Sequence, residues 1–299
     1  MADIKLFKIG VKVEEVISSN ALLEKHLQIV IENNMQGFFG VTFLASEFAT
    51  NNGGRMDSIG IDENYCPVIF EYKRNQNENV INQGLFYLDW LLSHKDSFKV
   101  LVIEKLGINI AGKIDWTMPR LICIAGDFNK YDESAINQMN RNISLIRYKK
   151  FGQDFLMLEQ LNQNVAKPIE EQIDEVKPKQ KVWDKWFQDF FNSATEENKT
   201  MFYAVTEYVS SLGDDVIENK LKLYYAYKKI KNFACVQIDK NKVIVNLHLD
   251  AKSMQFEDGF SRDVTDIGHW GTGNVQIWIK NQGDFEKAKP YIDRAYREN

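Results

Sequence analysis

The chain is poor in cysteine, the residue that marks secreted, disulfide-bonded proteins. It has 3 cysteines among 299 residues. No two cysteines form a Cys-x-x-Cys pair, and Cys123 and Cys235 lie in apolar runs, where free thiols are usually buried. An odd number of distant cysteines argues against a disulfide framework and favours a reducing, cytoplasmic compartment.

Long apolar runs and an excess of positive charge are also missing. No run is long enough to span a bilayer, and residues 1–7 lack the apolar core of a signal peptide, so we expect no membrane association. The formal net charge is -5 and the pI about 5.6. Any surface that binds nucleic acid must therefore be a local patch.

What the sequence does have is charge at the ends of two apolar segments. Residues 54–61 and 67–74 read as two strands joined by a polar turn around residues 62–64. The first segment contains Asp57 near its start, and the second ends in Glu71-Tyr72-Lys73. Charges are uncommon at the ends of buried strands unless they have a function.

The segments around this hairpin predict an α/β domain, because strands alternate with helices. Apolar residues at helical spacing predict helices over 19–33 and 80–93, and a short helix fits 131–141. Further strands are predicted at 41–48, 99–104, 120–125, 143–148 and 154–161.

A shift in composition then separates two domains. Residues 162–182 are acidic, contain Pro168 and Pro178 and predict a linker between a first domain at 1–161 and a second at 183–299. The second domain reads as α+β. It has helical patterns near 186–191, at 201–212 and at 285–297, a helix or extended arm at 221–229, a hairpin at 233–249 and a strand at 275–279.

The charged hairpin has the composition of a site for a hard divalent cation. Asp57 and Glu71 are candidate ligands for Mg²⁺ or Mn²⁺, and the backbone carbonyl of Tyr72 is a third. Alternation along a strand puts Glu71 and Lys73 on the same face, so Lys73 could orient an attacking water. The same pattern also fits an edge hairpin with solvated ends.

Residues on the flanking segments could complete such a site. Glu24 borders the apolar side of the first helix, Gln83 and Tyr87 share a helix face, and Glu47 precedes the turn. Each also fits an ordinary surface position. Arg55 and Arg74, next to the acidic and basic motif residues, are candidate phosphate contacts.

The chain resembles the PD-(D/E)xK nuclease superfamily in the order of these segments. A helix with Glu24 comes first, then Gly54-Arg55-Met56-Asp57, a strand with Glu71-Tyr72-Lys73, and a helix with Gln83 and Tyr87. Within that superfamily it resembles the DUF91-type nuclease domain of NucS-like mismatch endonucleases. The resemblance covers roughly residues 15–105. It implies a restriction-endonuclease-like mixed sheet flanked by helices, metal binding by Asp57 and Glu71, and catalysis by Lys73, Glu24, Gln83 and Tyr87. Tyr72 departs from the pattern, because relatives usually have an aliphatic residue there, and we expect its side chain to point outward.

Residues 183–299 resemble the DUF5655 family, which has no settled activity to carry over. The resemblance is carried by segments 212–216, 227–229, 232–235, 260–264 and 267–273. Lysines alternate with aromatic residues over 220–233, so Lys228 and Lys229 are candidate phosphate contacts, although the same pattern fits buried aromatics. His269 and Trp270 lie between glycines and could grip a ligand.

These features favour a metal-dependent endonuclease that acts on DNA in repair, restriction or defence. A non-cleaving nucleic-acid-binding or interaction protein and an RNase stay open, because nothing in the sequence distinguishes ribose from deoxyribose. NucS-type enzymes act as dimers, so the resemblance implies a homodimer.

Overall fold

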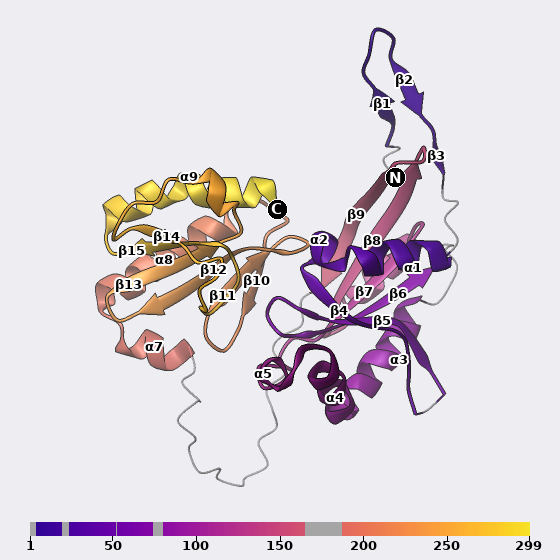
Figure 1. Cartoon of the computed structure of the whole chain (residues 1–299), viewed down its shortest axis with the longest axis horizontal. Helices are drawn as coiled ribbons and strands as arrows, with labels where there is room; N and C mark the ends of the chain where they lie inside the picture. Colours follow the sequence, from indigo (N-terminus) through magenta and orange to yellow (C-terminus); the bar gives the residue numbers. More distant parts are fainter. Residues whose placement is uncertain (1–3, 20–23, 52, 74–79, 165–186) are drawn as a thin grey trace. The chain divides into compact units, whose positions relative to one another are not determined.

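A computed structural model describes residues 4–19, 24–51, 53–73, 80–164 and 187–299 (Figure 1). The chain divides into two compact units, Met1–Ile169 and Glu170–Asn299. Arg74 and residues 165–182 of the predicted linker lie outside the described residues.

The first unit is built on a mixed seven-stranded sheet. The strand order is β3-β8-β7-β6-β5-β4, and β9 pairs with β8. The neighbours β6/β7 and β7/β8 are parallel, and the other pairs are antiparallel. The strands are β3 (Ser18–Ser19), β4 (Val41–Ala49), β5 (Arg55–Asp62), β6 (Pro67–Lys73), β7 (Arg120–Ala125), β8 (Asn142–Phe151) and β9 (Phe155–Asn164). A separate two-stranded ribbon consists of β1 (Leu6–Lys8) and β2 (Glu14–Val16).

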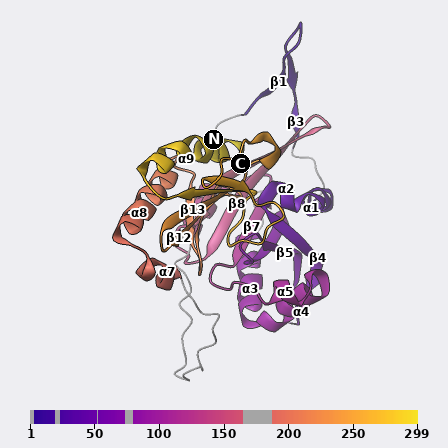
Figure 2. The same cartoon turned by 60° about the vertical axis from the view of Figure 1, so that its left-hand side comes forward.

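Helices cover both faces of this sheet (Figures 1 and 2). Phe39 of α2 contacts Phe70 of β6, with ring centroids 5.3 Å apart. Leu88 of α3 instead belongs to the same buried cluster as Ile69, the neighbour of Phe70 that points to the opposite face. The helices are α1 (Glu24–Asn33), α2 (Met35–Phe39), α3 (Val80–Ser93), α4 (Lys95–Leu106), α5 (Ile108–Ala111) and α6 (Lys130–Ile136).

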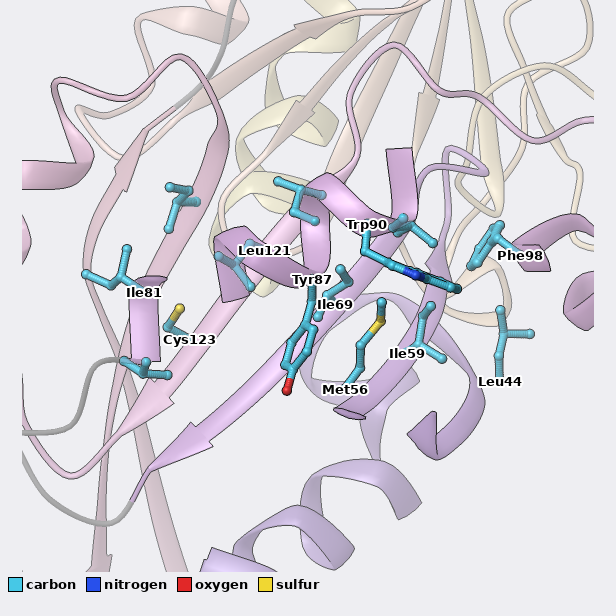
Figure 3. Packing of buried hydrophobic residues seen from close by; sticks show 14 of the residues in the cluster. Leu44, Met56, Ile59, Ile69, Ile81, Tyr87, Trp90, Phe98, Leu121 and Cys123 are labelled. Atoms are coloured by element: carbon cyan, nitrogen blue, oxygen red, sulfur yellow. The ribbon is translucent and has the colours of Figure 1, made fainter. Parts of the chain in front are cut away.

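The larger core of this unit lies between the sheet and α3 and α4. Figure 3 shows Ile59 and Ile69 of the central hairpin packed near Tyr87 and Trp90 of α3. The buried cluster therefore fixes the hairpin that carries Asp57 and Glu71 against the helix that carries Gln83 and Tyr87. Burial of each large apolar side chain contributes about 1.5–3 kcal/mol.

The structure corrects the sequence predictions for two segments of this unit. Residues 99–104 are not a strand but lie within α4. Val100 is 53% exposed whereas Leu101 and Val102 are buried, so these aliphatic residues face different sides of a helix. The linker also begins later than predicted, because residues 162–164 belong to β9, which pairs with β8.

The second unit is an antiparallel six-stranded sheet with two long helices. Its strand order is β10-β11-β12-β13-β15-β14. The strands are β10 (Ile217–Lys220), β11 (Tyr225–Lys228), β12 (Asn232–Asp239), β13 (Lys242–Leu247), β14 (Ser261–Asp263) and β15 (Val275–Ile279). The helices are α7 (Phe187–Ser193), α8 (Glu196–Ser210), the short 3-10 turn η1 (Ala251–Ser253) and α9 (Gln282–Glu298).

Both long helices pack on one face of this sheet. Val275, Ile277 and Ile279 of β15 are buried in one cluster with Phe202 of α8 and Ile292 of α9. The predicted hairpin and closing helix are present as β12–β13 and α9. Within residues 221–229 the structure has an extended strand, β11, rather than a helix.

Candidate functional site

The antiparallel hairpin β5–β6 brings Asp57 and Glu71 together. The strands pair Ser58 with Phe70, which leaves Asp57 and Glu71 as the next residues in register. The N–H of Asp57 donates to Oε1 of Glu71 at 3.3 Å, and the N–H of Tyr72 donates to Oδ2 of Asp57 at 2.9 Å. The two carboxylates are therefore each held by the backbone of the opposite strand.

Both carboxylates lie in surroundings that disfavour negative charge. The side chain of Glu71 is 0% exposed. Burial, and then the charge of neighbouring Asp57, raises the pKa of Glu71 to about 9. Burial also raises the pKa of Asp57, although the hydrogen bond from Tyr72 opposes the change. A pair of carboxylates with raised pKa values is a common property of functional sites.

One oxygen of this pair marks where a cation would fit. Oε2 of Glu71 is shielded from solvent and has no hydrogen-bond partner within the described part of the chain. A divalent cation beside it would satisfy this oxygen and remove the repulsion between the two carboxylates. No group of three or more His, Cys, Asp or Glu side chains could hold a metal among the residues described. Two carboxylates, the nearby backbone of Tyr72 and water suit Mg²⁺, which keeps several of its waters.

Lys73 and Glu24 meet at the mouth of the same hairpin. Nζ of Lys73 lies 3.5 Å from Oε1 of Glu24, and the Lys73 side chain is largely buried while that of Glu24 is partly exposed. The charge of Lys73 acts on both Asp57 and Glu71. The structure thus brings a residue of α1 to the end of β6.

Gln83 and Tyr87 of α3 form another side of the site. Nε2 of Gln83 donates to the Tyr87 hydroxyl at 3.4 Å, and that hydroxyl accepts from the N–H of Arg55 at 3.2 Å. Gly54 lies against the same ring, because a Cβ built there would be 2.6 Å from Cε1 of Tyr87. Tyr87 is therefore fixed by both α3 and the start of β5.

These residues line one open cleft of about 650 Å³. The cleft is polar and lies where β4, β5, β6, α1 and α3 approach one another. Its lining consists of Glu24, Ala49, Thr50, Gly53, Gly54, Arg55, Asp57, Lys73, Gln83 and Tyr87. Glu71 lies beneath this surface, next to Asp57.

Glu47 approaches the site on an unusual backbone. Its φ of 53° lies in the left-handed region, which a residue other than glycine seldom adopts. The neighbouring pairs Ser46–Ser58 and Phe48–Met56 place Glu47 opposite Asp57. Lys25 lies 2.8 Å and Nε of Arg55 2.6 Å from its carboxylate, and the hydrogen bond from Lys25 lowers the pKa of Glu47. Arg55 thus reaches the cleft while paired with Glu47.

A buried polar network beneath the hairpin was not expected from the sequence. Tyr72 was predicted to point outward, but it is 0% exposed. Its hydroxyl lies 3.1 Å from Oγ of Ser58, which donates to Glu32 at 2.6 Å. Gln28 of α1 donates to the carbonyl oxygen of Asp57 at 2.7 Å. A tyrosine fits here because Ser58 of β5 is a polar partner for its hydroxyl, and Glu32 of α1 is in turn a partner for Ser58.

The remaining predicted contacts lie in the second unit. Lys228 is 3% exposed, so its burial argues against a contact with phosphate. Lys229 donates to the carbonyl oxygen of Tyr296 at 3.0 Å and lies over its ring. Nδ1 of His269 lies 2.7 Å from the carbonyl oxygen of Ile267. These separate partners do not join the three residues into one site.

Trp270 makes contacts that hold its own loop in place. Its ring packs against Phe190, with centroids 5.2 Å apart. Its carbonyl oxygen accepts hydrogen bonds from Gln237 and Asn246. The loop is therefore shaped by its backbone, while the indole remains partly exposed.

Comparisons with known proteins match the second unit to a family. Residues 187–299 match the family described as "Domain of unknown function (DUF5655)". An uncharacterized protein of Haemophilus influenzae is 27% identical over 285 residues, which cover 92% of this chain and 93% of that protein. In the described part of the chain, no helix combines the length and the apolar character needed to cross a membrane.

Two solved structures also match part of the chain. One is the "Structure of EndoMS-dsDNA2 complex", with 17% identity, a TM-score of 0.26 and coverage of 42% of this chain and 44% of that chain. The other is a repair endonuclease from Pyrococcus abyssi, with 16% identity, a TM-score of 0.24 and coverage of 40% and 45%. The chain spans less than half of each, and scores this low assign neither a fold nor a function.

Proposed function

We propose that the first unit is a divalent-metal-dependent endonuclease that hydrolyses phosphodiester bonds in DNA. The observation that carries this proposal is the buried pair Asp57–Glu71, with the unsatisfied Oε2 of Glu71 and the ammonium group of Lys73 nearby. Holding two carboxylates together lowers stability, so a function that uses them explains the arrangement better than a structural role does.

Each residue of the site has a role that follows from its position. Asp57 and Glu71, with the backbone carbonyl of Tyr72, would hold Mg²⁺ or Mn²⁺. The chemistry that such a cation supplies is charge neutralisation on the phosphate and acidification of a water. Lys73 orients that water or stabilises the charge that develops on the phosphate oxygens. Glu24 lies beside the Lys73 ammonium and helps to position it.

The cleft suits a phosphodiester. The attacking water gives up a proton as its oxygen forms a bond to phosphorus. The bond between phosphorus and one nucleoside oxygen breaks, and that leaving oxygen takes up a proton. Gln83 and Tyr87 present an amide and a hydroxyl on the wall of the cleft, where they can position the phosphate or the water. Arg55 is exposed at the rim and can contact a neighbouring phosphate.

A single assay with several substrates tests the proposal. The full chain is incubated with labelled single-stranded, duplex, branched and mismatched DNA and with RNA, in Mg²⁺, in Mn²⁺ and in EDTA. We expect metal-dependent cleavage of DNA that falls by about 100-fold or more in Asp57→Asn, Glu71→Gln and Lys73→Met, since each removes a group that acts in the transition state. Lys105→Gln, at an exposed position of α4, is the control and should cleave like the wild type.

Each other outcome identifies an alternative. Cleavage of RNA alone would make the protein an RNase. Salt-dependent binding without cleavage of any substrate would indicate a non-cleaving protein that binds nucleic acid. Wild-type cleavage by all three site variants, with the fold retained, would refute the assignment of the site.

A further inference from the structure

An indole of the second unit is surrounded by positive charge. Three cations lie close to the ring of Trp278 in β15. Nζ of Lys242 is 4.5 Å, Cζ of Arg262 4.9 Å and Nζ of Lys280 5.9 Å from the ring centroid. Such contacts with an aromatic ring are favourable individually, but they also bring like charges together.

The pairing of strands explains why these side chains share one face. Ile244 pairs with Trp278, and Arg262 pairs with Gln276. Because side chains alternate along a strand, Trp278 and Gln276 point away from the face on which Ile277 packs with α8 and α9. The cations therefore gather on the sheet face opposite the helices.

Amide side chains hold two members of the cluster in place. Oε1 of Gln276 accepts from Nε and Nη2 of Arg262, at 2.9 and 2.7 Å, and from Nε1 of Trp278 at 3.0 Å. Gln276 is 4% exposed, and its own Nε2 donates to Oδ1 of Asn246 at 2.9 Å. Arg262 is thus fixed by neutral groups, so its positive charge is not cancelled locally.

Within the described residues, carboxylates do not balance this charge. In the described part of the chain, no carboxylate lies within ion-pair distance of Lys242, Arg262 or Lys280, and Nζ of Lys280 donates to the carbonyl oxygen of Gly259 at 2.7 Å. Two acids near these cations along the chain are engaged by backbone groups. Asp239 accepts from the N–H of Lys240, and Asp284 accepts from the N–H of Lys280.

Other lysines of the same unit show the contrast. Lys199, Lys287 and Lys289 also lie over aromatic rings, but each has a glutamate within 2.9 Å. Contact with a ring therefore does not by itself explain why the Trp278 cations lack acidic partners among the described residues. The exposed side chains of Arg262 and Lys280 leave this charge open to an external anion.

We propose that Lys242, Arg262 and Lys280 around Trp278 form a contact surface for the phosphate backbone of DNA. The proposal rests on the proposed function for its choice of ligand. Duplex DNA presents about one charge per 1.7 Å of its axis, so several phosphates can meet a cluster of this kind. Contacts of lysine and arginine with phosphates carry no sequence information, so we expect this binding to be independent of sequence.

Fluorescence anisotropy in EDTA tests binding separately from cleavage. The full chain is titrated onto a fluorescein-labelled duplex over a range of salt concentrations. In the triple variant Lys242→Gln, Arg262→Gln, Lys280→Gln, the Kd should rise at least tenfold. The slope of log K against log salt should become shallower by about 0.9 for each phosphate that the variant no longer neutralises. The triple variant Lys199→Gln, Lys287→Gln, Lys289→Gln changes the net charge equally and should leave Kd within about twofold of the wild type.

The outcomes separate the two proposals. The double variant Lys242→Gln, Lys280→Gln preserves the hydrogen bonds of Arg262. It replaces the triple variant if that variant fails to fold, and it should also weaken DNA binding. Asp57→Asn should abolish cleavage while retaining DNA binding. Three results would overturn the proposed contact surface. They are equal effects of the two triple variants, unchanged DNA binding by the folded cluster variants, and binding of the wild type to anionic phospholipid vesicles but not to DNA.

Discussion

The N–H of Asp57 donates to Oε1 of Glu71 at 3.3 Å, so the backbone of one strand holds the carboxylate of the next. The N–H of Tyr72 holds Asp57 in return. This exchange fixes two acidic groups close together before any cation is present. The arrangement lowers electrostatic stability but requires little rearrangement for binding.

The first prediction concerns stability and pH without metal. Because the pKa of Glu71 is raised to about 9, the folded protein keeps a proton that the unfolded chain loses above its ordinary pKa of 4.5. The contribution of Glu71 to the free energy of unfolding is therefore fully present below the pKa of the unfolded chain, and it is lost as the pH rises towards 9. Between pH 6 and 8 we expect the free energy of unfolding to fall by about 2–3 kcal/mol from this group.

Urea denaturation in EDTA at several pH values measures this effect. Glu71→Gln keeps the shape of the side chain but cannot ionise. The difference in stability between wild type and Glu71→Gln should therefore shift steadily in favour of the variant as the pH rises. A difference that does not change between pH 6 and 8 would contradict the raised pKa.

The second prediction concerns stabilisation by metal. A cation bound between Asp57 and Glu71 must displace the proton held by the pair, so its affinity should rise with pH. At a concentration 100 times its Kd, the cation should stabilise the protein by about 2.7 kcal/mol. Thermal unfolding with Mg²⁺ or Mn²⁺ should show a larger rise in Tm at pH 8 than at pH 6. Glu71→Gln and Asp57→Asn should lose most of this rise, and an equal rise in these variants would place the cation elsewhere.

The sequence predicts the hairpin and its charged ends because the information is local. Two apolar runs around a polar turn specify β5 and β6, and alternation alone puts Glu71 and Lys73 on one face. Local patterns mislead where tertiary packing decides. Val100 and its aliphatic neighbours have strand-like composition, yet α4 forms because Leu101 and Val102 pack on the rest of the unit.

Other features depend on residues that are distant in the chain. The burial of Tyr72 requires Ser58 from β5 and Glu32 from α1, and neither is adjacent to it in sequence. The cations around Trp278 come together only when β15 pairs with β13 and β14. An interpretation based on spacing within one segment could not place these partners.

The third prediction concerns the network around Ser58. Tyr72→Phe removes one hydroxyl but leaves the bond from Ser58 to Glu32, so it should cost about 0.5–1.5 kcal/mol. Ser58→Ala leaves the hydroxyl of buried Tyr72 and the carboxylate of Glu32 without this partner. It should therefore lower the free energy of unfolding by about 1–3 kcal/mol more than Tyr72→Phe does.

A double-mutant cycle by urea denaturation measures the coupling. The double variant should cost less than the two single variants together, because the unsatisfied tyrosine hydroxyl is gone. Strictly additive costs would show that the two hydroxyls do not interact.

The last prediction uses the close approach of Gly54 to Tyr87. A Cβ at Gly54 would lie 2.6 Å from Cε1 of Tyr87 and 2.9 Å from Oγ1 of Thr50, so Gly54→Ala must displace a wall of the cleft. Gly84→Ala makes a similar clash with Leu121 in the core, and Gly37→Ala meets nothing within 4 Å. We expect Gly54→Ala and Gly84→Ala each to cost about 1–3 kcal/mol, because both overpack the fold.

Activity distinguishes the first two variants. At a temperature where all variants are folded, Gly54→Ala should lower the rate of DNA cleavage by about tenfold or more, because a misplacement of about 1 Å can cost that much or more. Gly84→Ala should keep most of its activity once folded, and Gly37→Ala should match the wild type. Cleavage by folded Gly54→Ala at the wild-type rate would show that the position of Tyr87 does not matter for the reaction.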